Sequence, residues 1–442
     1  SLSIVSAETS TLTIIGTPAQ SFAGNLGFLQ LVFGYLLARI VISVLLLPHY
    51  WRGEMLTAYE LMRRRFGERT RKITASIFLV TRALAEGVRV FAISIVVSII
   101  LGTGEVASIV VIVMLTLFYT FEGGMTAVIW TDVVQMALYV FGAALSFWVI
   151  LAKIPGGWEH VAAVAGEAGK FQLFDFGFAP TLEFFSRPFT FLAGILGGCF
   201  LTTASHGTDQ LMVQRLLSGR SEAESRAALL ASWVVIFFQF ALFLLIGILL
   251  FVYYGDHALP PPAQADRIYP EFIWRNLPAG VAGLVMAAIL AAAMANISAA
   301  LNSLASTTMV DFYRPLARAQ QASEAGQLRL ARVATLVWGA VLLAIGILAR
   351  KWGSVLIAGL TIASIPLGAL LGVFLLGVLT RLPGQRSALI GVLGGLATVM
   401  YVRFFTPIAW TWYVLIGTTG TFVLGWLASR LWKEPVSPHA RA

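Results

Sequence analysis

The amino-acid sequence predicts an all-α integral membrane protein, and three observations support that fold class. Of its 442 residues, 58% are hydrophobic and only 12% are charged, whereas soluble domains carry about 25% charged residues. Apolar runs long enough to cross about 30 Å of hydrocarbon recur along the whole chain. Lysine and arginine gather in alternate loops between these runs, as the positive-inside rule requires. The formal charge of +9 therefore reflects membrane topology rather than nucleic-acid binding.

Twelve apolar runs are candidates for transmembrane helices, although the first is polar in places. They lie at about 1–19, 27–51, 74–102, 104–121, 125–152, 188–213, 227–254, 277–309, 332–349, 353–380, 387–403 and 409–432. The loops on one side and the C-terminal tail carry 19 lysines and arginines, whereas the opposite side carries eight. This asymmetry predicts a multi-pass protein of the cell membrane with its C-terminus in the cytoplasm.

The first and sixth runs are too polar to be ordinary spanning helices. The first places Glu8 among serines and threonines, and the sixth combines four glycines with Ser205, His206 and Asp209. Irregular backbone at membrane depth is tolerated only where it is buried in protein or lines a cavity. We therefore predict two interrupted helices whose free main-chain groups bind an ion and a solute. The alternative is that the small residues only permit close helix packing.

The spacing of these two unusual runs, five apart, predicts two inverted repeats of five helices. The first repeat is expected at 1–152 and the second at 188–380, with an external loop at 153–187 between them. Two extra helices and a cytoplasmic tail are expected at 381–442. The basic internal segment 52–73 is expected to be either an amphipathic helix at the headgroups or a solvated loop.

Several ionisable residues lie inside apolar runs, where an isolated charge costs roughly 2.5–3.5 kcal/mol. Asp132 lies about two turns inside the fifth run and marks an ion or substrate route. Arg82, Glu86 and Arg89 are spaced to share one helix face. They predict either a structural ion pair or recruitment of an anionic substrate. Arg39 has no obvious partner in the sequence.

Five motifs, in the right order across the chain, resemble the sodium:solute symporter family. They are VSAET at 5–9, LLPHYWRGEMLTAYELMRRRF at 46–66, EGGMTAVIWTDVVQ at 122–135, GTDQLMVQRLLSGRS at 207–221 and MANISAALNSLASTTMVDFYRP at 294–315. The stretch at 46–66 is most similar to the branch that carries iodide, monocarboxylates and vitamins. The resemblance implies a LeuT-like five-plus-five inverted-repeat fold and secondary transport. It also implies that the first half of the first core helix is missing from this chain.

The resemblance implies Na⁺ as the coupling ion, and the family's main sodium site can be carried over residue by residue. Its main-chain oxygens correspond to Leu2, Val5 and Ala292. The two hydroxyl positions are occupied by Ala295 and Asn296 in this chain. The alanine offers no side-chain oxygen, so the site departs from the family pattern.

A second cation site of some relatives corresponds to Asp132, Ser298 and Ala299, and here too one hydroxyl is lost. A proton-coupled or uncoupled carrier of the same fold is therefore the alternative. Asp132 is itself a candidate proton site, because burial raises the pKa of a carboxyl group.

The substrate site is also implied by the resemblance. In sugar-carrying relatives a glutamine, an asparagine and a lysine hold the sugar, whereas this chain has Thr9, Thr202 and Ile236 at these positions. A hexose is therefore disfavoured, and a small organic anion is expected. The expected pocket comprises Ser6, Thr9, Thr202, Ser205 and His206, with walls from Phe33 and Tyr35. The alternative for His206 is a structural hydrogen bond between helices.

Other functional classes are disfavoured by the sequence. The five histidines are scattered and lack the spacing of a metal centre, and no P-loop is present. We therefore expect no enzyme, although a membrane sensor that uses the transporter fold is a further alternative. A solute and the lipid bilayer are the expected partners, with no nucleic acid and no obligate protein partner. The single cysteine, Cys199, is expected to be inert packing.

Overall fold

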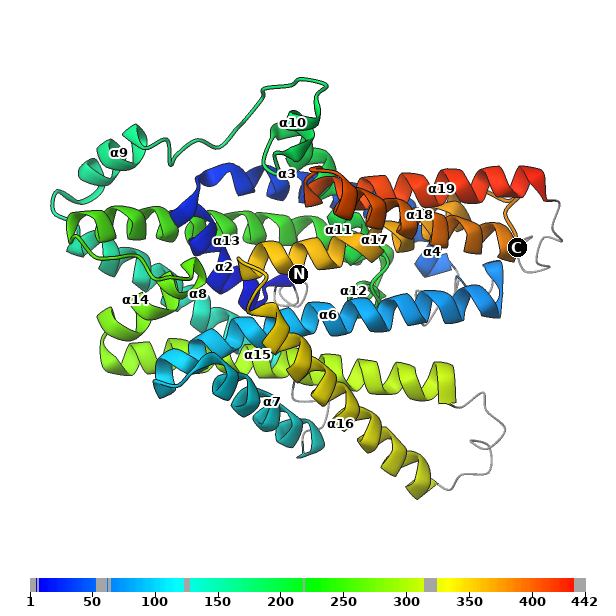
Figure 1. The fold of residues 1–442 in the computed structure, drawn as a ribbon, viewed down its shortest axis with the longest axis horizontal. Helices are drawn as coiled ribbons and strands as arrows, with labels where there is room; N and C mark the ends of the chain where they lie inside the picture. Colours follow the sequence, from blue (N-terminus) through cyan, green and yellow to red (C-terminus); the bar gives the residue numbers. More distant parts are fainter. Residues whose placement is uncertain are drawn as a thin grey trace.

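The computed structural model describes residues 5, 8–52, 62, 65–122, 128–217, 219–313 and 324–432. These residues form α-helices and short 3₁₀- and π-helices joined by loops, and no strand occurs among them. Most of the long helices run along the longest axis of the molecule (Figure 1). The all-α fold class predicted from composition is therefore confirmed.

Nine helices among the described residues are long and apolar enough to cross a membrane. They are Leu26–Trp51 (which includes α3, Leu29–Val41), α6 (Glu68–Leu101), Val134–Lys153 of α8 (Val128–Lys153), α13 (Glu222–Asp256), α15 (Ala279–Thr307), α16 (Glu324–Ala349), α17 (Val355–Leu379), α18 (Gln385–Phe405) and α19 (Tyr413–Leu431, preceded by η8, Trp410–Trp412). These nine coincide with nine of the twelve predicted runs. The fourth run forms α7 (Glu105–Glu122), whose apolar part is shorter. The first and sixth runs are interrupted.

The interruption in the first run lies at Thr9 and Ser10, which are not helical. The backbone N–H of Thr9 donates to the carbonyl of Val5 (2.9 Å) and closes the last turn before the break. Helix α2 (Thr11–Ala23) then begins, with the Ser10 carbonyl accepting from Ile14 N–H at 3.2 Å. The predicted break in this run is therefore confirmed.

The sixth run is interrupted at Thr208 and Asp209. It begins with a π-helical turn, η4 (Ala193–Gly197), and continues as α11 (Gly198–Gly207) and α12 (Gln210–Leu217). Thr208 N–H donates to Ala204 and ends α11, whereas the Asp209 carbonyl accepts from Val213 N–H at the start of α12. The chain thus has both predicted helix breaks, each with main-chain groups outside a continuous helix.

Glycine allows α3 and the sixth run to touch through their backbones. A Cβ added at Gly198 would lie 2.3 Å from the carbonyl oxygen of Leu31, and one at Gly34 would lie 2.6 Å from the carbonyl of Gly194. Small residues of this kind permit close helix packing in membranes. The close contact fixes α11, and with it the second break, against α3.

The two C-terminal helices pack on α17 in the same way. A Cβ at Gly368 would lie 2.9 Å from the Cα of Gly417, and one at Gly372 would lie 2.5 Å from the Cβ of Thr421. These two glycines therefore permit close packing of α17 against α19. Because α17 also contacts α2 and α11, the extra pair of helices packs behind a helix that adjoins both helix breaks.

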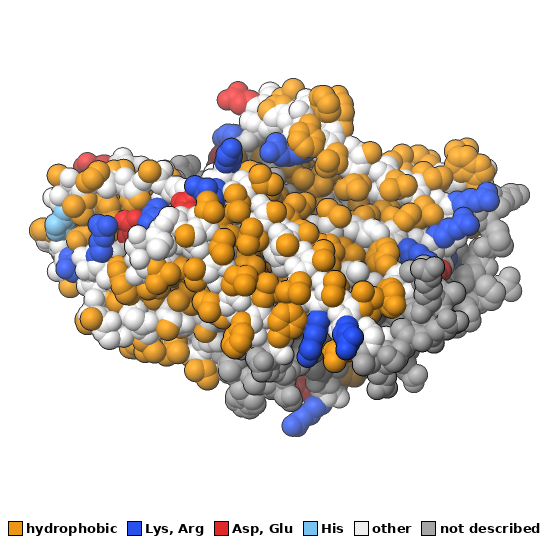
Figure 2. All heavy atoms as spheres, turned by 60° about the horizontal axis from the view of Figure 1, so that its bottom comes forward, with side chains coloured by type: hydrophobic (Ala, Val, Ile, Leu, Met, Phe, Trp, Pro, Cys, Tyr) orange, Lys and Arg blue, Asp and Glu red, His pale blue; other side chains and the backbone are white. Residues whose placement is uncertain are grey.

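The surface and loops agree with a membrane protein. Hydrophobic side chains cover the middle of the face shown in Figure 2, and large side chains such as Phe118, Phe141 and Phe238 are exposed. Two long loops contain short helices: α9 (Gly157–Glu167), α10 (Leu182–Ser186), η5 (Ala265–Arg267) and α14 (Ile268–Asn276). Most of the predicted amphipathic segment at 52–73 lies outside the described residues.

Candidate functional site

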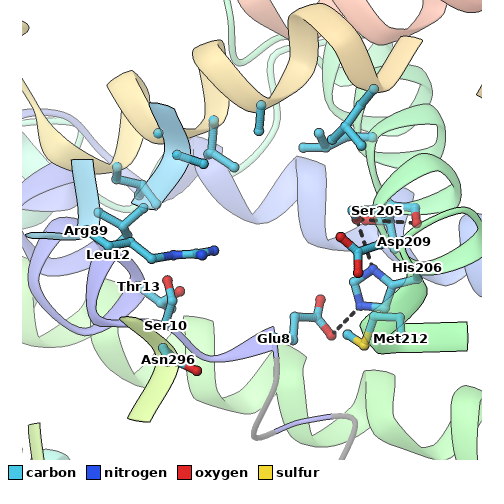
Figure 3. Close-up of a pocket in the computed structure, with 18 of the residues that line it drawn as sticks. Glu8, Ser10, Leu12, Thr13, Arg89, Ser205, His206, Asp209, Met212 and Asn296 are labelled. Atoms are coloured by element: carbon cyan, nitrogen blue, oxygen red, sulfur yellow. Dashed lines mark hydrogen bonds and ion pairs between the residues drawn. The ribbon is translucent and has the colours of Figure 1, made fainter. Parts of the chain in front are cut away.

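A cavity of about 280 Å³ lies where the two helix breaks meet. Glu8 and Ser10 reach it from the first break, Ser205, His206 and Asp209 from the second, and further lining residues come from α6, α13, α15 and α17 (Figure 3). Its volume is near the lower end of the range for small-molecule sites, about 300–1,000 Å³. The arrangement suits a small solute enclosed by polar and apolar side chains.

A buried ion pair joins the first break to α3. The guanidinium of Arg39 is fully buried and lies 2.5 Å from Glu8 Oε2. It also donates to the hydroxyl of Ser232 and to the carbonyl of Tyr35, both at 3.2 Å. The partner of Arg39, which the sequence left open, is therefore Glu8. Glu8 belongs to the first helix break and not to α3, the helix that carries Arg39.

His206 links the two breaks. Its Nε2 lies 3.3 Å from Glu8 Oε2, and its Nδ1 lies 2.9 Å from the hydroxyl of Ser205. The Ser205 contact is to the neighbouring residue of α11, and the Nε2 atom that approaches Glu8 makes no hydrogen bond among the described residues, so whether His206 serves mainly to join the helices stays a prediction. The same side chain lines the cavity, so a solute there would lie beside it.

The charged residues of α6 form a shared ion pair at the cavity wall. Glu86 is fully buried and pairs with both Arg89 and Arg82, the latter at 3.1 Å. Arg82 also lies 4.0 Å from Asp209 of the second break. The structural pairing predicted from the spacing is confirmed, yet both guanidinium groups still line the cavity. Figure 3 shows Arg89 extending into the open space.

The structure brings together only part of the predicted substrate pocket. Thr202, Ser205 and His206 line the cavity, whereas Ser6 lies outside the described residues. Thr9 does not line it, because its hydroxyl donates to the Val5 carbonyl (2.9 Å) and to Gln239 Oε1 (3.0 Å).

Of the two predicted aromatic walls, the structure supports one. Tyr35 lines the cavity, and its ring contacts Phe240, which also lines it. Phe33 is absent from the lining and instead stacks on Phe174 of the external loop, with ring centroids 5.8 Å apart. The expectation for Phe33 was wrong, because its side chain leaves α3 on a different face from Tyr35.

The predicted sodium ligands are only partly described. Leu2 lies outside the described residues, and so does the side chain of Asp132, although its backbone belongs to α8. The Val5 carbonyl accepts from both the backbone and the hydroxyl of Thr9. Ala292 belongs to α15 but does not line the cavity.

Asn296 is the predicted ligand that the structure places best. It lines the cavity, and Figure 3 shows it beside Ser10 of the first break and Thr13 of α2. Ser298, on the same helix, accepts a hydrogen bond from Thr120 at 2.8 Å. No cluster of three His, Cys, Asp or Glu residues that could hold a metal occurs in the described part of the chain.

Sequence reasoning missed Glu8 and Gln239 as site residues. A signal for Glu8 was present, because a carboxylate in the first run and a guanidinium in the second each need an opposite charge in the membrane. Gln239 belongs to a run of otherwise apolar residues in α13. Its amide oxygen accepts from Thr9, a contact that only the folded structure reveals.

Comparison with known proteins agrees with this architecture. Residues 1–395 match the sequence pattern of the sodium:solute symporter family. The chain is 27% identical to the human sodium/iodide cotransporter over 411 residues, which is 91% of this chain but only 62% of that protein. It is 26% identical to the sodium/sialic acid symporter NanT of Aliivibrio fischeri over 440 residues, covering 98% of this chain and 85% of that one.

Solved structures show the same fold. A Na⁺-coupled sialic acid symporter in a substrate-bound, outward-open state matches with a TM-score of 0.81 and 26% identity, over 98% of this chain and 89% of that chain. A nucleobase-cation-symport-1 family transporter matches with a TM-score of 0.57 and 14% identity, over 97% and 91% of the two chains, and supports the fold alone. The predicted LeuT-like fold is therefore confirmed, and the relatives are transporters rather than enzymes. The chain belongs to the sodium:solute symporter family.

Proposed function

We propose that this chain couples sodium entry to uptake of a small organic anion, by giving the cavity alternating access to the two sides of the cell membrane. The observation that supports this most directly is the guanidinium of Arg89, which extends into a cavity formed at two helix breaks. Relatives are named for iodide, sialic acid and monocarboxylates, all of which are anionic solutes.

The ion pairs of α6 support an anionic substrate. One carboxylate, that of Glu86, is shared by two guanidinium groups, Arg82 and Arg89. The Nε atom of Arg89 is buried without a hydrogen-bond partner among the described residues. A partly buried cation that is incompletely neutralised gains from an opposite charge within reach. A carboxylate placed in the cavity beside Arg89 would supply it.

Sodium coupling is supported by the family and by the oxygens of α15. Asn296 faces the first helix break, and Ser298 lies toward α7. A cation bound between α15 and the first break would favour one arrangement of these elements over another. Coupling requires this difference in affinity between the two states. Asp132 and Ala292 remain candidates for the same role.

A transport assay tests the proposal. Purified protein would first be screened by thermal shift against monocarboxylates, sugars and amino acids, in sodium and in potassium. The best ligands would then be followed as labelled solutes into liposomes under a sodium gradient. We expect acids to bind, and we expect a sodium gradient, but not a potassium gradient, to drive their accumulation.

The variant Arg89→Gln removes the charge and keeps a shorter polar side chain, so it should weaken anion binding about tenfold or more. Arg187→Gln is the matched control, because this exposed arginine pairs with Asp175 (2.7 Å) in the external loop, away from the cavity. Tighter binding of neutral sugars than of acids would contradict the anion assignment. Equal uptake in potassium, or uptake driven by a pH gradient alone, would contradict sodium coupling.

A further inference from the structure

The loop between α9 and α10 carries a cluster of exposed apolar side chains. Every second residue from Phe174 to Phe178 is a phenylalanine. Phe176 is 66% exposed and Phe178 62%, and Leu182 at the start of α10 is also 62% exposed. Large apolar side chains that are exposed together mark a surface that contacts something outside the described chain.

The polar groups between these phenylalanines are bonded inside the protein. The N–H of Asp175 donates to Gln30 Oε1 (3.1 Å), and its carbonyl accepts from the N–H of Phe191 (2.8 Å). The N–H of Gly177 donates to Asp175 Oδ1 (3.1 Å), and its carbonyl accepts from Arg187 (3.3 Å). The Arg187 guanidinium also pairs with the Asp175 carboxylate at 2.7 Å. Lipid supplies no hydrogen-bond partners, so a loop against lipid needs its main-chain groups bonded internally.

The first phenylalanine of the loop joins the outer face of a spanning helix. Phe174 stacks on Phe33 of α3, with ring centroids 5.8 Å apart. Phe33 lies seven residues into the span Leu26–Trp51, so it is about 10 Å below the external end of that span. Its helical spacing places it on one face with three exposed side chains, Leu37, Ile40 and Val44. The apolar surface of the loop therefore continues a surface that faces the hydrocarbon.

The far end of the loop is fixed beside the two C-terminal helices. The carbonyl of Phe185 in α10 accepts from the N–H of Ala409 (2.9 Å), between α18 and η8. The ring of Phe185 also contacts that of Trp412 in η8, with centroids 5.2 Å apart. In Figure 1 the loop passes along the outside of the helical bundle, beside α3, before it forms α10. It is thus held against the side of the bundle.

We propose that residues 174–182 form an aromatic anchor in the outer leaflet of the bilayer, with Phe176, Phe178 and Leu182 against the acyl chains. Glu183 of α10 is exposed, and a charge next to Leu182 would be costly at the bilayer centre. The aromatic anchor therefore lies at the boundary between headgroups and acyl chains, as interfacial apolar segments do. Because Gln30 bonds both the anchor and the carbonyl of Phe189 (2.8 Å), contact with lipid there also steadies the start of α3.

Site-directed spin labelling of the full chain tests this placement. In a Cys199→Ser background, which removes the chain's single cysteine, one cysteine would be placed in turn at each exposed anchor position: Phe176, Phe178 and Leu182. Val44→Cys is the reference for a side chain in lipid. Leu259→Cys is the matched control, because this exposed apolar residue lies in the loop beyond the end of α13. Three anchor positions keep the test usable if one variant fails to fold.

The labelled proteins would be reconstituted in liposomes of phosphatidylethanolamine and phosphatidylglycerol. Collision rates of the label would be measured with oxygen, which enters the acyl chains, and with a water-soluble nickel chelate, which does not. At the anchor positions we expect a ratio of oxygen to nickel collisions several times higher than at Leu259 and close to that at Val44.

A ratio at the anchor positions equal to that at Leu259 would overturn the proposal, because the loop would then lie in water. Low collision rates with both reagents would also overturn it, since protein rather than lipid would cover the face. Dipolar broadening between labels would identify that protein as a second copy of this chain. None of these outcomes depends on the solute or on sodium, so the proposed function is tested separately.

Discussion

At the scale of single residues, the pair Arg39–Glu8 decides whether charge can exist at the first helix break. Arg39 is fully buried, and its hydrogen bonds within the described part of the chain end on the first break, on its own helix or on α13. A buried ion pair is weak evidence of net stabilisation, but removing one partner leaves an uncompensated charge. The pair is therefore best understood as fixing the position of Glu8 in the cavity wall.

Arg39→Met should destabilise the protein by about 3–5 kcal/mol, because it leaves the Glu8 carboxylate buried beside His206 alone. Glu8→Gln/Arg39→Met should recover most of this loss. Thermal unfolding of the purified variants in detergent gives the comparison. If the single and double variants melt together, the charge imbalance is not the cause of the loss.

At the scale of helices and loops, the contact between α3 and α11 tests how tightly the second break is held. Gly198→Ala would place a methyl group 2.3 Å from the Leu31 carbonyl, and overpacking of this kind costs about 1–3 kcal/mol. Gly280→Ala is the matched control, since nothing lies within 4 Å of that position in α15. We expect thermal unfolding to show a loss for the first and no loss, or a small gain, for the second. Equal behaviour of the two would mean that α11 moves aside easily.

The loop that contains η5 is tied to α17 by a buried carboxyl group. Asp266 is 4% exposed, and its Oδ2 accepts from the backbone N–H of Val355 at 2.9 Å, at the first turn of α17. Burial raises the pKa of Asp266 from 3.8 to about 6, although the Val355 hydrogen bond opposes the rise. The folded protein thus favours the protonated form of Asp266. The stability that it contributes is complete below about pH 3.8 and is lost as the pH rises through 6.

Asp266→Asn should remove this pH dependence. The stability of the variant relative to the original chain should rise by up to about 3 kcal/mol between pH 4 and pH 7. Thermal unfolding of both proteins is measured across this pH interval. The difference in stability between them isolates Asp266, because the other titrating groups are the same in both proteins. A constant difference at all pH values would show that Asp266 titrates normally and that its burial does not persist in solution.

A second external tether holds α2. The ammonium of Lys170 donates to the carbonyl of Phe22 in the last turn of that helix (2.7 Å) and lies 4.2 Å from the ring centroid of Phe251. Burial lowers the pKa of Lys170. A cation at a helix C-terminus interacts favourably with the helix dipole. The two loops thus fasten both helices on the side that we assign to the exterior.

At the scale of the whole molecule, properties that depend on many residues could be predicted, and single contacts could not. Composition and the alternation of basic loops predict the class and nearly all of the spans, because each span repeats the same physical requirement. Polar residues in apolar runs predict the two breaks for the same reason. In contrast, Glu8 and Arg39 are 31 positions apart, and nothing in the sequence around either residue indicates that the two form an ion pair. The turning of Thr9 toward Gln239 likewise depends on how α2 packs against α13.

The direction in which the cavity opens is a property of the whole molecule. The cavity is lined by the buried side chains of Leu12, Phe28 and Phe240 and also by Arg215 of α12, which lies next to a basic loop. By the positive-inside rule that loop is cytoplasmic. We therefore expect this structure to represent the inward-facing state, in which the solute site communicates with the cytoplasm.

Ser205→Cys in a Cys199→Ser background tests this expectation, because Ser205 lines the cavity and Cys199 is the chain's single cysteine. A membrane-impermeant thiol reagent should label the new cysteine rapidly in inside-out vesicles and slowly in right-side-out vesicles when sodium is absent. Sodium, which is expected to favour the outward-facing state, should reverse the two rates by shifting the population between states. If labelling without sodium is faster from the exterior, then either the predicted membrane topology or the inward-facing assignment is wrong. If sodium leaves both labelling rates unchanged, sodium binding is not coupled to the change between inward-facing and outward-facing states.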